Sequence, residues 1–223
     1  MITLYHSVSA RSFRPLWLME ELGLTYVLRM LPFPPRILQK DYLDVNPLGT
    51  VPYFVDGNVE MTESVAICQY LAARYGSAAL DIGREDTEFG NYLNWLHFGE
   101  ATLTFPQTIV LRYSRFEPSD RQLPQAVEDY ARWFFARLRR VEAAVSSCEY
   151  LCGGRFTAAD VSVGYALMLA EQLAISERFQ PGVTAYWRRL QARSSFRQAL
   201  QRQHQEALAQ EIPTTPSACV VMP

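Results

Sequence analysis

The sequence lacks most of the short motifs that identify an enzyme by themselves. It contains no G-x-G-x-x-G nucleotide motif, no phosphate-binding loop, no G-x-S-x-G serine nucleophile and no H-E-x-x-H zinc motif. Its four cysteines form no Cys-x-x-Cys pair, and no group of His and Cys has zinc spacing. Dinucleotide, nucleoside triphosphate and zinc chemistry therefore have no support, and we expect no metal.

The chain also has no large excess of acidic or basic residues and no extended apolar stretch. The net charge is −2 at pH 7 and the isoelectric point is near 6.0, which favours neither nucleic acid nor an anionic membrane as partner. No apolar run reaches the roughly 20 residues that a membrane helix needs, and residues 1–5 lack the pattern of a signal peptide. We expect a cytoplasmic protein whose cysteines are free thiols.

The first 75 residues alternate between strand patterns and helix patterns. Gly23 and Asn46-Pro47 are helix stops, and Asp56-Gly57 is a strong hairpin signal. Strands are expected at 2–6, 25–31, 52–55 and 58–61, and helices at 13–22, 36–45 and 64–75. The resulting order, βαβ-α-ββα, is that of a thioredoxin-like domain.

The remainder of the chain has helical periodicity and no strand signal. Residues 77–85 include small residues, Gly83 and several charges, and they have no clear period, so we interpret them as a linker. Helices are expected at 85–115, 122–147, 158–174, 182–192 and 194–210, with a kink at Pro106 in the first and an irregular tail at 213–223. The fold class is therefore α/β plus all-α, with domains at 1–76 and 86–223.

Thr157 and Asp160 have the spacing of a capping box at the start of one of these helices. The Thr157 hydroxyl can accept from the Asp160 N–H, while the Asp160 carboxylate accepts from the Thr157 N–H. Phe156 and Val161 occupy the positions of a hydrophobic staple around the same helix start. This pattern predicts a role in folding rather than in chemistry.

Residues 46–70 are the most informative stretch. Asn46-Pro47-Leu48-Gly49-Thr50-Val51-Pro52-Tyr53 is a tight turn leading into a strand, and Glu63-Ser64 opens an apolar helix. Such a combination can hold a small zwitterionic peptide by its backbone and its charged end. It closely resembles the glutathione-binding half of soluble, cytosolic-type glutathione S-transferases, in particular bacterial-style members of the Ser/Cys type, and the resemblance covers nearly the whole chain.

The resemblance implies how glutathione is bound. It implies that Thr50, Val51 and Pro52 form a backbone clamp for the cysteinyl part, with a cis bond before the proline. Glu63 and Ser64 match the acid–serine pair that holds the γ-glutamyl end; a helix N-terminus suits its carboxylate. Gln39 and Lys40 lie where the family often contacts the glycyl carboxylate, although Lys40 also fits a solvated charge.

The residue that activates the thiol is expected in the loop 7–12, between the first strand and the first helix. Ser9 is preferred there, and Ser12 is a competitor that is also suited to be the helix N-cap. Arg11 could add positive potential for a thiolate or be a surface charge. A hydroxyl or N–H aimed at sulfur near a helix N-terminus favours the thiolate.

The leading functional hypothesis is a glutathione transferase that joins the glutathione thiolate to small electrophiles, with glutathione as co-substrate. Members of the family are usually homodimers. Alternatives are a glutathione-dependent isomerase or dehalogenase, or a non-catalytic protein that binds glutathione or another ligand on the same fold. The electrophile is expected near the first helices of the second domain, in a region that contains Tyr92, Trp95, His97, Phe98, Glu100 and Phe105.

Overall fold

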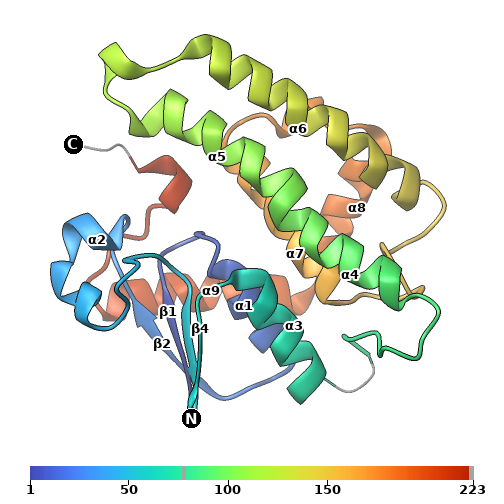
Figure 1. Cartoon of the computed structure of the whole chain (residues 1–223), viewed down its shortest axis with the longest axis horizontal. Coiled ribbons are helices and arrows are strands. Elements are labelled where there is room, and N and C mark those ends of the chain that lie inside the picture. Colours follow the sequence, from blue (N-terminus) through green and yellow to red (C-terminus); the bar gives the residue numbers. More distant parts are fainter. Residues whose placement is uncertain (77–78, 221–223) are drawn as a thin grey trace. The chain divides into compact units, whose positions relative to one another are not determined.

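The computed structural model describes residues 1–76 and 79–220, and contacts divide it into two compact units. The first unit contains Met1–Tyr75 and Arg193–Ser217, and the second contains Gly76–Ala192 and the chain from Ala218 onward (Figure 1). Residues 193–217 fall within the all-α domain predicted from the sequence, whereas their contacts place them in the first unit. Domain boundaries at 1–76 and 86–223 stay a prediction, and residues 77–78 of the predicted linker lie outside the described residues.

The first unit is built on a four-stranded sheet of order β2-β1-β3-β4. The strands are β1 (Ile2–His6), β2 (Tyr26–Met30), β3 (Tyr53–Asp56) and β4 (Val59–Met61). β1 pairs parallel to β2 and antiparallel to β3, and its side chains alternate between buried and half-buried positions. The predicted thioredoxin-like βαβ-α-ββα order is confirmed.

The helices of this unit are α1 (Phe13–Glu21), α2 (Pro35–Leu38), α3 (Ser64–Tyr75) and α9 (Ser194–Ala209). The prediction of one helix over 36–45 is wrong, because Gln39 has non-helical backbone angles, φ −141° and ψ 80°, that end α2. A 3-10 helix, Lys40–Asp44, follows it. α1 packs against both α3 and α9.

The last helix, α9, completes the hydrophobic interior of the first unit. Phe196 meets Trp17 edge-on at 4.9 Å between ring centroids and Phe13 at 5.6 Å. Gln210, which follows the helix, accepts from the Met30 N–H and donates to the Leu28 carbonyl, each at 2.9 Å. These bonds satisfy backbone groups of the edge strand β2 that no further strand covers.

The regular elements in the described part of the second unit are helices, apart from an isolated β-bridge between Cys152 and Arg155. Its α-helices are α4 (Phe89–His97), α5 (Phe105–Leu111), α6 (Pro124–Val145), α7 (Ala158–Gln172) and α8 (Pro181–Gln191). The single helix expected over 85–115 is instead interrupted by a π-helical segment, Phe98–Thr104, and a second follows α5 at Arg112–Phe116. Pro106 is the second residue of α5, two positions after the end of the first π-helical segment. A proline has no N–H to donate, and its ring displaces the carbonyl four residues earlier.

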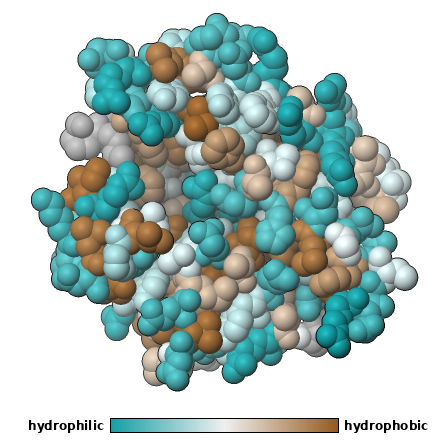
Figure 2. Space-filling view, viewed as in Figure 1, coloured by the Kyte–Doolittle hydropathy of each residue, from teal (hydrophilic) through white to brown (hydrophobic). Residues whose placement is uncertain are grey.

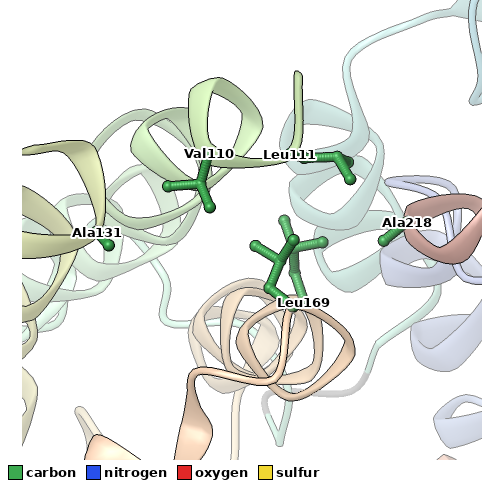
Figure 3. Packing of buried hydrophobic residues seen from close by; sticks show 6 residues of the cluster. Val110, Leu111, Ala131, Leu169 and Ala218 are labelled. Atoms are coloured by element: carbon green, nitrogen blue, oxygen red, sulfur yellow. The ribbon is translucent and has the colours of Figure 1, made fainter. Parts of the chain in front are cut away.

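α7 forms the centre of the second unit, and most of its residues are buried. The predicted Thr157–Asp160 capping box is present at its start. Leu169 of α7 packs in a core cluster with Val110, Leu111, Ala131, Leu173 and Ala218 (Figure 3). Ala218 comes from the predicted irregular tail, where a short 3-10 helix, Ser217–Cys219, forms. Across the described chain, every helix is too short or too polar to cross a membrane.

Candidate glutathione site in the first unit

The pairing of β1 with β3 brings the predicted site segments to one end of the sheet. Tyr5 near the end of β1 lies opposite Tyr53 at the start of β3. The loop after β1, residues 7–12, therefore emerges at the same edge as residues 50–52 before β3. The first turn of α1 is tied to the first turn of α3 at the same time, because Arg14 donates to Ser64 Oγ at 3.1 Å.

Ser9 and Ser12 both lie in the interior, with 3% and 0% of their surfaces exposed. Ser9 has a positive φ of 56°, an unusual backbone state for a residue with a side chain. Its N–H donates to Gln203 Oε1 at 2.9 Å, and its Oγ accepts from Gln203 Nε2 at 3.2 Å. Arg11 between the two serines is half-buried.

Ser12 does not cap α1, so the expected capping role is wrong. Its backbone is already helical, with φ −64° and ψ −10°, and its side chain makes no capping bond. An N-cap residue needs extended angles to aim its oxygen at the helix N–H groups. The Ser12 Oγ instead lies 2.7 Å from His6 Nδ1.

His6 and Gln203 were missed by the sequence analysis. His6 ends β1, is completely buried, and places its Nε2 3.0 Å from Gln203 Oε1. Burial lowers the pKa of His6 to about 4, although its hydrogen bond with Gln203 acts in the opposite direction. The imidazole is therefore neutral at physiological pH. No local signal marks this pair, since the two residues are far apart in the chain.

The turn before β3 is fixed by hydrogen bonds to one carbonyl. The Thr50 carbonyl accepts from the Tyr42 hydroxyl at 2.8 Å and from Asn46 Nδ2 at 2.9 Å. The Val51–Pro52 peptide bond is cis, as the sequence resemblance implied. Thr50 is exposed and Val51 is half-buried, so this turn presents backbone at the surface of the unit.

Glu63 and Ser64 open α3 as predicted. Glu63 is exposed, and its carbonyl accepts from the Ile67 N–H at 2.9 Å. Ser64 is buried. Arg14 is completely buried beneath Ser64, and the sequence analysis did not identify it. A guanidinium and a helix N-terminus together make positive potential there, which suits a carboxylate ligand.

Gln39 and Lys40 lie at the junction between α2 and the 3-10 helix that follows. Lys40 is exposed and Gln39 is half-buried. They lie close in sequence to Tyr42, whose hydroxyl donates to the Thr50 carbonyl and so holds the turn before β3. Their predicted contact with a ligand stays a prediction, as do the ligand contacts of the other site residues.

Residues 1–73 match the family model described as "Glutathione S-transferase, N-terminal domain". The chain is 31% identical over 170 residues to Glutathione S-transferase 3 of Zea mays, which covers 73% of this chain and 75% of that protein. The chain belongs to the glutathione S-transferase family.

Two further similarities extend over nearly all of this glutathione S-transferase chain. Glutathione S-transferase 3 of Schizosaccharomyces pombe is 26% identical over 212 residues, covering 91% of this chain and 88% of that protein. The crystal structure of glutathione transferase URE2P6 from Phanerochaete chrysosporium in complex with oxidized glutathione superposes with a TM-score of 0.80. It is 25% identical and covers 92% of this chain and 96% of the other.

The second unit of this family member carries an open pocket of about 360 Å³ along α4 and the π-helical segment. Its lining consists of Leu93, Asn94, His97, Phe98, Ala101 and Thr102. Of the residues predicted near the electrophile, His97 and Phe98 line this pocket. Tyr92 and Trp95 are instead buried in the core, and Arg140 lies over the Trp95 ring at 5.3 Å.

Proposed function

We propose that this protein is a glutathione transferase of the serine type, which joins the thiolate of glutathione to small electrophilic substrates. The observation that carries the proposal is the Arg14–Ser64 pair at the N-terminus of α3, at a helix end suited to a carboxylate. The cis turn at Val51–Pro52 supports it, as do the relatives named glutathione S-transferase.

Each part of glutathione has a proposed partner in the first unit. Ser64 and Glu63 hold the γ-glutamyl carboxylate and ammonium, and Arg14 adds positive charge behind Ser64. The backbone of residues 50–52 pairs with the cysteinyl part. Gln39 and Lys40 hold the glycyl carboxylate, and Arg11 adds positive potential near the sulfur.

The proposed chemistry needs a thiolate at neutral pH. A free thiol has a pKa of about 8.5, and each unit of lowering corresponds to about 1.4 kcal/mol. A hydroxyl proton directed at sulfur favours the thiolate. The thiol proton passes to solvent, the sulfur lone pair forms a bond to the electrophilic carbon, and a leaving group departs with its bonding electrons. Orientation and charge stabilisation are the contributions required of the protein.

Calorimetry with glutathione and turnover of a chlorodinitrobenzene test the proposal. We expect saturable binding and conjugation by the wild type. Ser64→Ala should weaken binding by roughly tenfold to a hundredfold, the effect of one charge-assisted hydrogen bond. A glutathione analogue without the α-carboxylate should bind the variant and the wild type about equally.

Exposed Ser147, on the second unit, provides the matched Ser→Ala control. Failure of the wild type to bind glutathione would overturn the proposal. Binding without turnover of any electrophile would instead favour the non-catalytic alternative, and turnover confined to isomerisation or dehalogenation would favour the other enzymatic one.

A homodimer is part of the proposal. Five large apolar side chains are exposed in and after α2: Ile37, Leu38, Leu43, Val45 and Leu48. Figure 2 shows hydrophobic surface at the left, where α2 lies in Figure 1. Clustered exposed apolar residues mark interaction surfaces. Sedimentation velocity measures the mass, and a monomer at micromolar concentration would contradict this assignment.

A cytoplasmic location is also proposed, because all four cysteines are free thiols and a reducing compartment keeps them so. Localisation of a fluorescent fusion in the native host tests it. A signal confined to the cell envelope or the medium would contradict it.

A further inference from the structure

The carbonyl of Thr50 is held by two side-chain donors from one segment of the first unit. The Tyr42 hydroxyl donates to it at 2.8 Å, and Asn46 Nδ2 donates to it at 2.9 Å. Tyr42 and Asn46 are each only 2% exposed. A carbonyl oxygen has two lone pairs, so these two bonds occupy its acceptor capacity. A ligand at this turn therefore meets a carbonyl that is already paired.

The surroundings of the two side chains show that both are donors. A backbone N–H can only donate, so the Asn46 atom that faces the Leu48 N–H at 3.2 Å is the oxygen Oδ1. The amide nitrogen of Asn46 is then the atom that faces Thr50. Burial raises the pKa of Tyr42, although its bond with Asn46 acts in the opposite direction. Tyr42 therefore keeps the hydroxyl proton that it donates.

These bonds set the direction of the next backbone N–H. The peptide bond between Thr50 and Val51 is trans, and in a planar trans peptide the C=O and the N–H point to opposite sides. Because the Thr50 carbonyl points at Tyr42 and Asn46, the Val51 N–H points away from them. Thr50 is exposed and Val51 is half-buried, so this peptide lies at the surface of the first unit, where a ligand can reach it.

Tyr42 is itself held by its ring and by its backbone. The centroid of its ring lies 5.7 Å from that of Tyr5 in β1. Its N–H donates to the Gln39 carbonyl at 3.1 Å. The hydroxyl therefore reaches Thr50 from a ring whose position is already fixed by β1 and by the 3-10 helix to which Tyr42 belongs.

We propose that Tyr42 is a positioning residue for glutathione. Together with Asn46, its hydroxyl turns the Thr50–Val51 peptide so that the Val51 N–H is presented to the carbonyl of the cysteinyl part. The inference rests on the proposed function. Tyr42 acts through Thr50 and not by contact with the ligand. Without its hydroxyl, the Thr50 carbonyl keeps only the bond to Asn46, and the peptide gains freedom to rotate.

The hydrogen bond to this peptide can be tested without glutathione. The dipeptide Thr-Val occurs once in the chain, at residues 50–51. Protein labelled with carbon-13 in the threonine carbonyl and nitrogen-15 in valine therefore gives one cross-peak in a spectrum that correlates each amide with the preceding carbonyl. Tyr42→Phe keeps the ring and removes the hydroxyl. We expect the carbonyl resonance to move upfield in this variant, because a hydrogen bond deshields a carbonyl carbon. An unmoved cross-peak would overturn the proposal.

Calorimetry tests the effect on binding. Tyr42→Phe should weaken glutathione binding by roughly threefold to tenfold, the effect of one neutral hydrogen bond. A glutathione analogue with an alkene in place of the amide between its cysteinyl and glycyl parts cannot accept from the Val51 N–H. It should bind the variant and the wild type about equally. Equal weakening for both ligands would reveal a general structural defect and overturn the positioning role, as would an unchanged affinity for glutathione.

Tyr70→Phe is the matched control, because Tyr70 also donates a hydroxyl proton within the first unit, to Asp56 Oδ2 at 2.8 Å. Asp56 ends β3, whereas the turn at Thr50 precedes that strand. Tyr70→Phe should lower thermal stability and leave both the cross-peak and the glutathione affinity unchanged. A wild type that does not bind glutathione would overturn the proposed function, while the cross-peak would still decide whether Tyr42 holds the Thr50 carbonyl.

Discussion

At the scale of single residues, Asp160 is a completely buried acid whose carboxylate has several hydrogen-bond donors. Its carboxylate accepts from the N–H groups of Leu151 and Thr157 at 3.1 and 2.9 Å, and from the Tyr186 hydroxyl at 2.8 Å. Burial nevertheless raises the pKa of Asp160 to about 6, because desolvation outweighs the donors that favour the charged form.

This pKa predicts a pH dependence of stability. An unfolded Asp has a pKa near 3.8, so between pH 4 and 6 the folded protein holds more protons than the unfolded one. Its free energy of unfolding should therefore fall as pH rises through this window. Relative to Asp160→Asn, the wild type should lose up to about 3 kcal/mol between pH 4 and 7.

Urea unfolding at a series of pH values measures this difference, with Asp120→Asn at an exposed position as control. A flat difference between wild type and Asp160→Asn would show that the hydrogen-bond donors offset burial completely. Independently of pH, Asp160→Ala should cost more than Asp160→Asn, because it leaves buried donors without an acceptor.

At the scale of elements, the π-helical segment after α4 lies against the central helix α7. A Cβ on Gly99 would stand 2.5 Å from the backbone carbon of Ser162 and 2.3 Å from its Oγ. The widened turns are supported by side chains, since Thr104 donates to the Gly99 carbonyl and Ser162 to the Leu96 carbonyl. Close approach of backbone to backbone therefore requires glycine at this position.

Gly99→Ala should destabilise the second unit by about 1–3 kcal/mol or more, as overpacking does. Gly90→Ala is the matched control, because it lies in α4 where an added Cβ meets nothing within 4 Å. That substitution should stabilise the helix by about 0.5–1 kcal/mol. Thermal unfolding of the two variants should show melting temperatures displaced in opposite directions. A Gly99→Ala variant as stable as wild type would contradict the close packing of Gly99 against Ser162.

At the scale of the whole molecule, the chain passes between its two units more than once. It leaves the first unit after Tyr75, returns at Arg193, and ends in the second unit from Ala218 onward. Arg115 of the second unit donates to the Ala218 carbonyl at 2.7 Å and to the Gln172 carbonyl at 3.0 Å. Each unit therefore needs residues from the last part of the chain to complete its interior.

The proposed homodimer predicts a change of mass on substitution of the exposed apolar cluster. Wild type should sediment at about twice 25.5 kDa. The double variant Leu38→Glu, Leu48→Glu should sediment as a monomer at micromolar concentration, because charges opposed across an interface are costly to bury. Leu208→Glu, at an isolated exposed leucine of α9, is the control and should leave the mass unchanged. A double variant that keeps the wild-type mass would place the interface elsewhere.

Secondary elements with local signals could be predicted from the order of amino acids alone. Gly23, the Asp56-Gly57 turn and the Thr157–Asp160 box act on residues within a few positions, so their effects are visible in the order of amino acids. The thioredoxin-like order of strands and helices followed from the local signals of the first 75 residues. The family resemblance supplied the candidate residues at 50–52 and 63–64, whose ligand contacts stay predictions.

The partners of groups that are far apart in the chain became known only from the folded structure. The sequence analysis preferred Ser9 to Ser12 by position alone, and only the fold shows that Ser9 contacts Gln203 whereas Ser12 contacts His6. The Arg14–Ser64 pair and the placement of α9 in the first unit arise in the same way. The physical reason is that a buried hydrogen bond depends on where packing places both partners, and residue order alone does not specify that position.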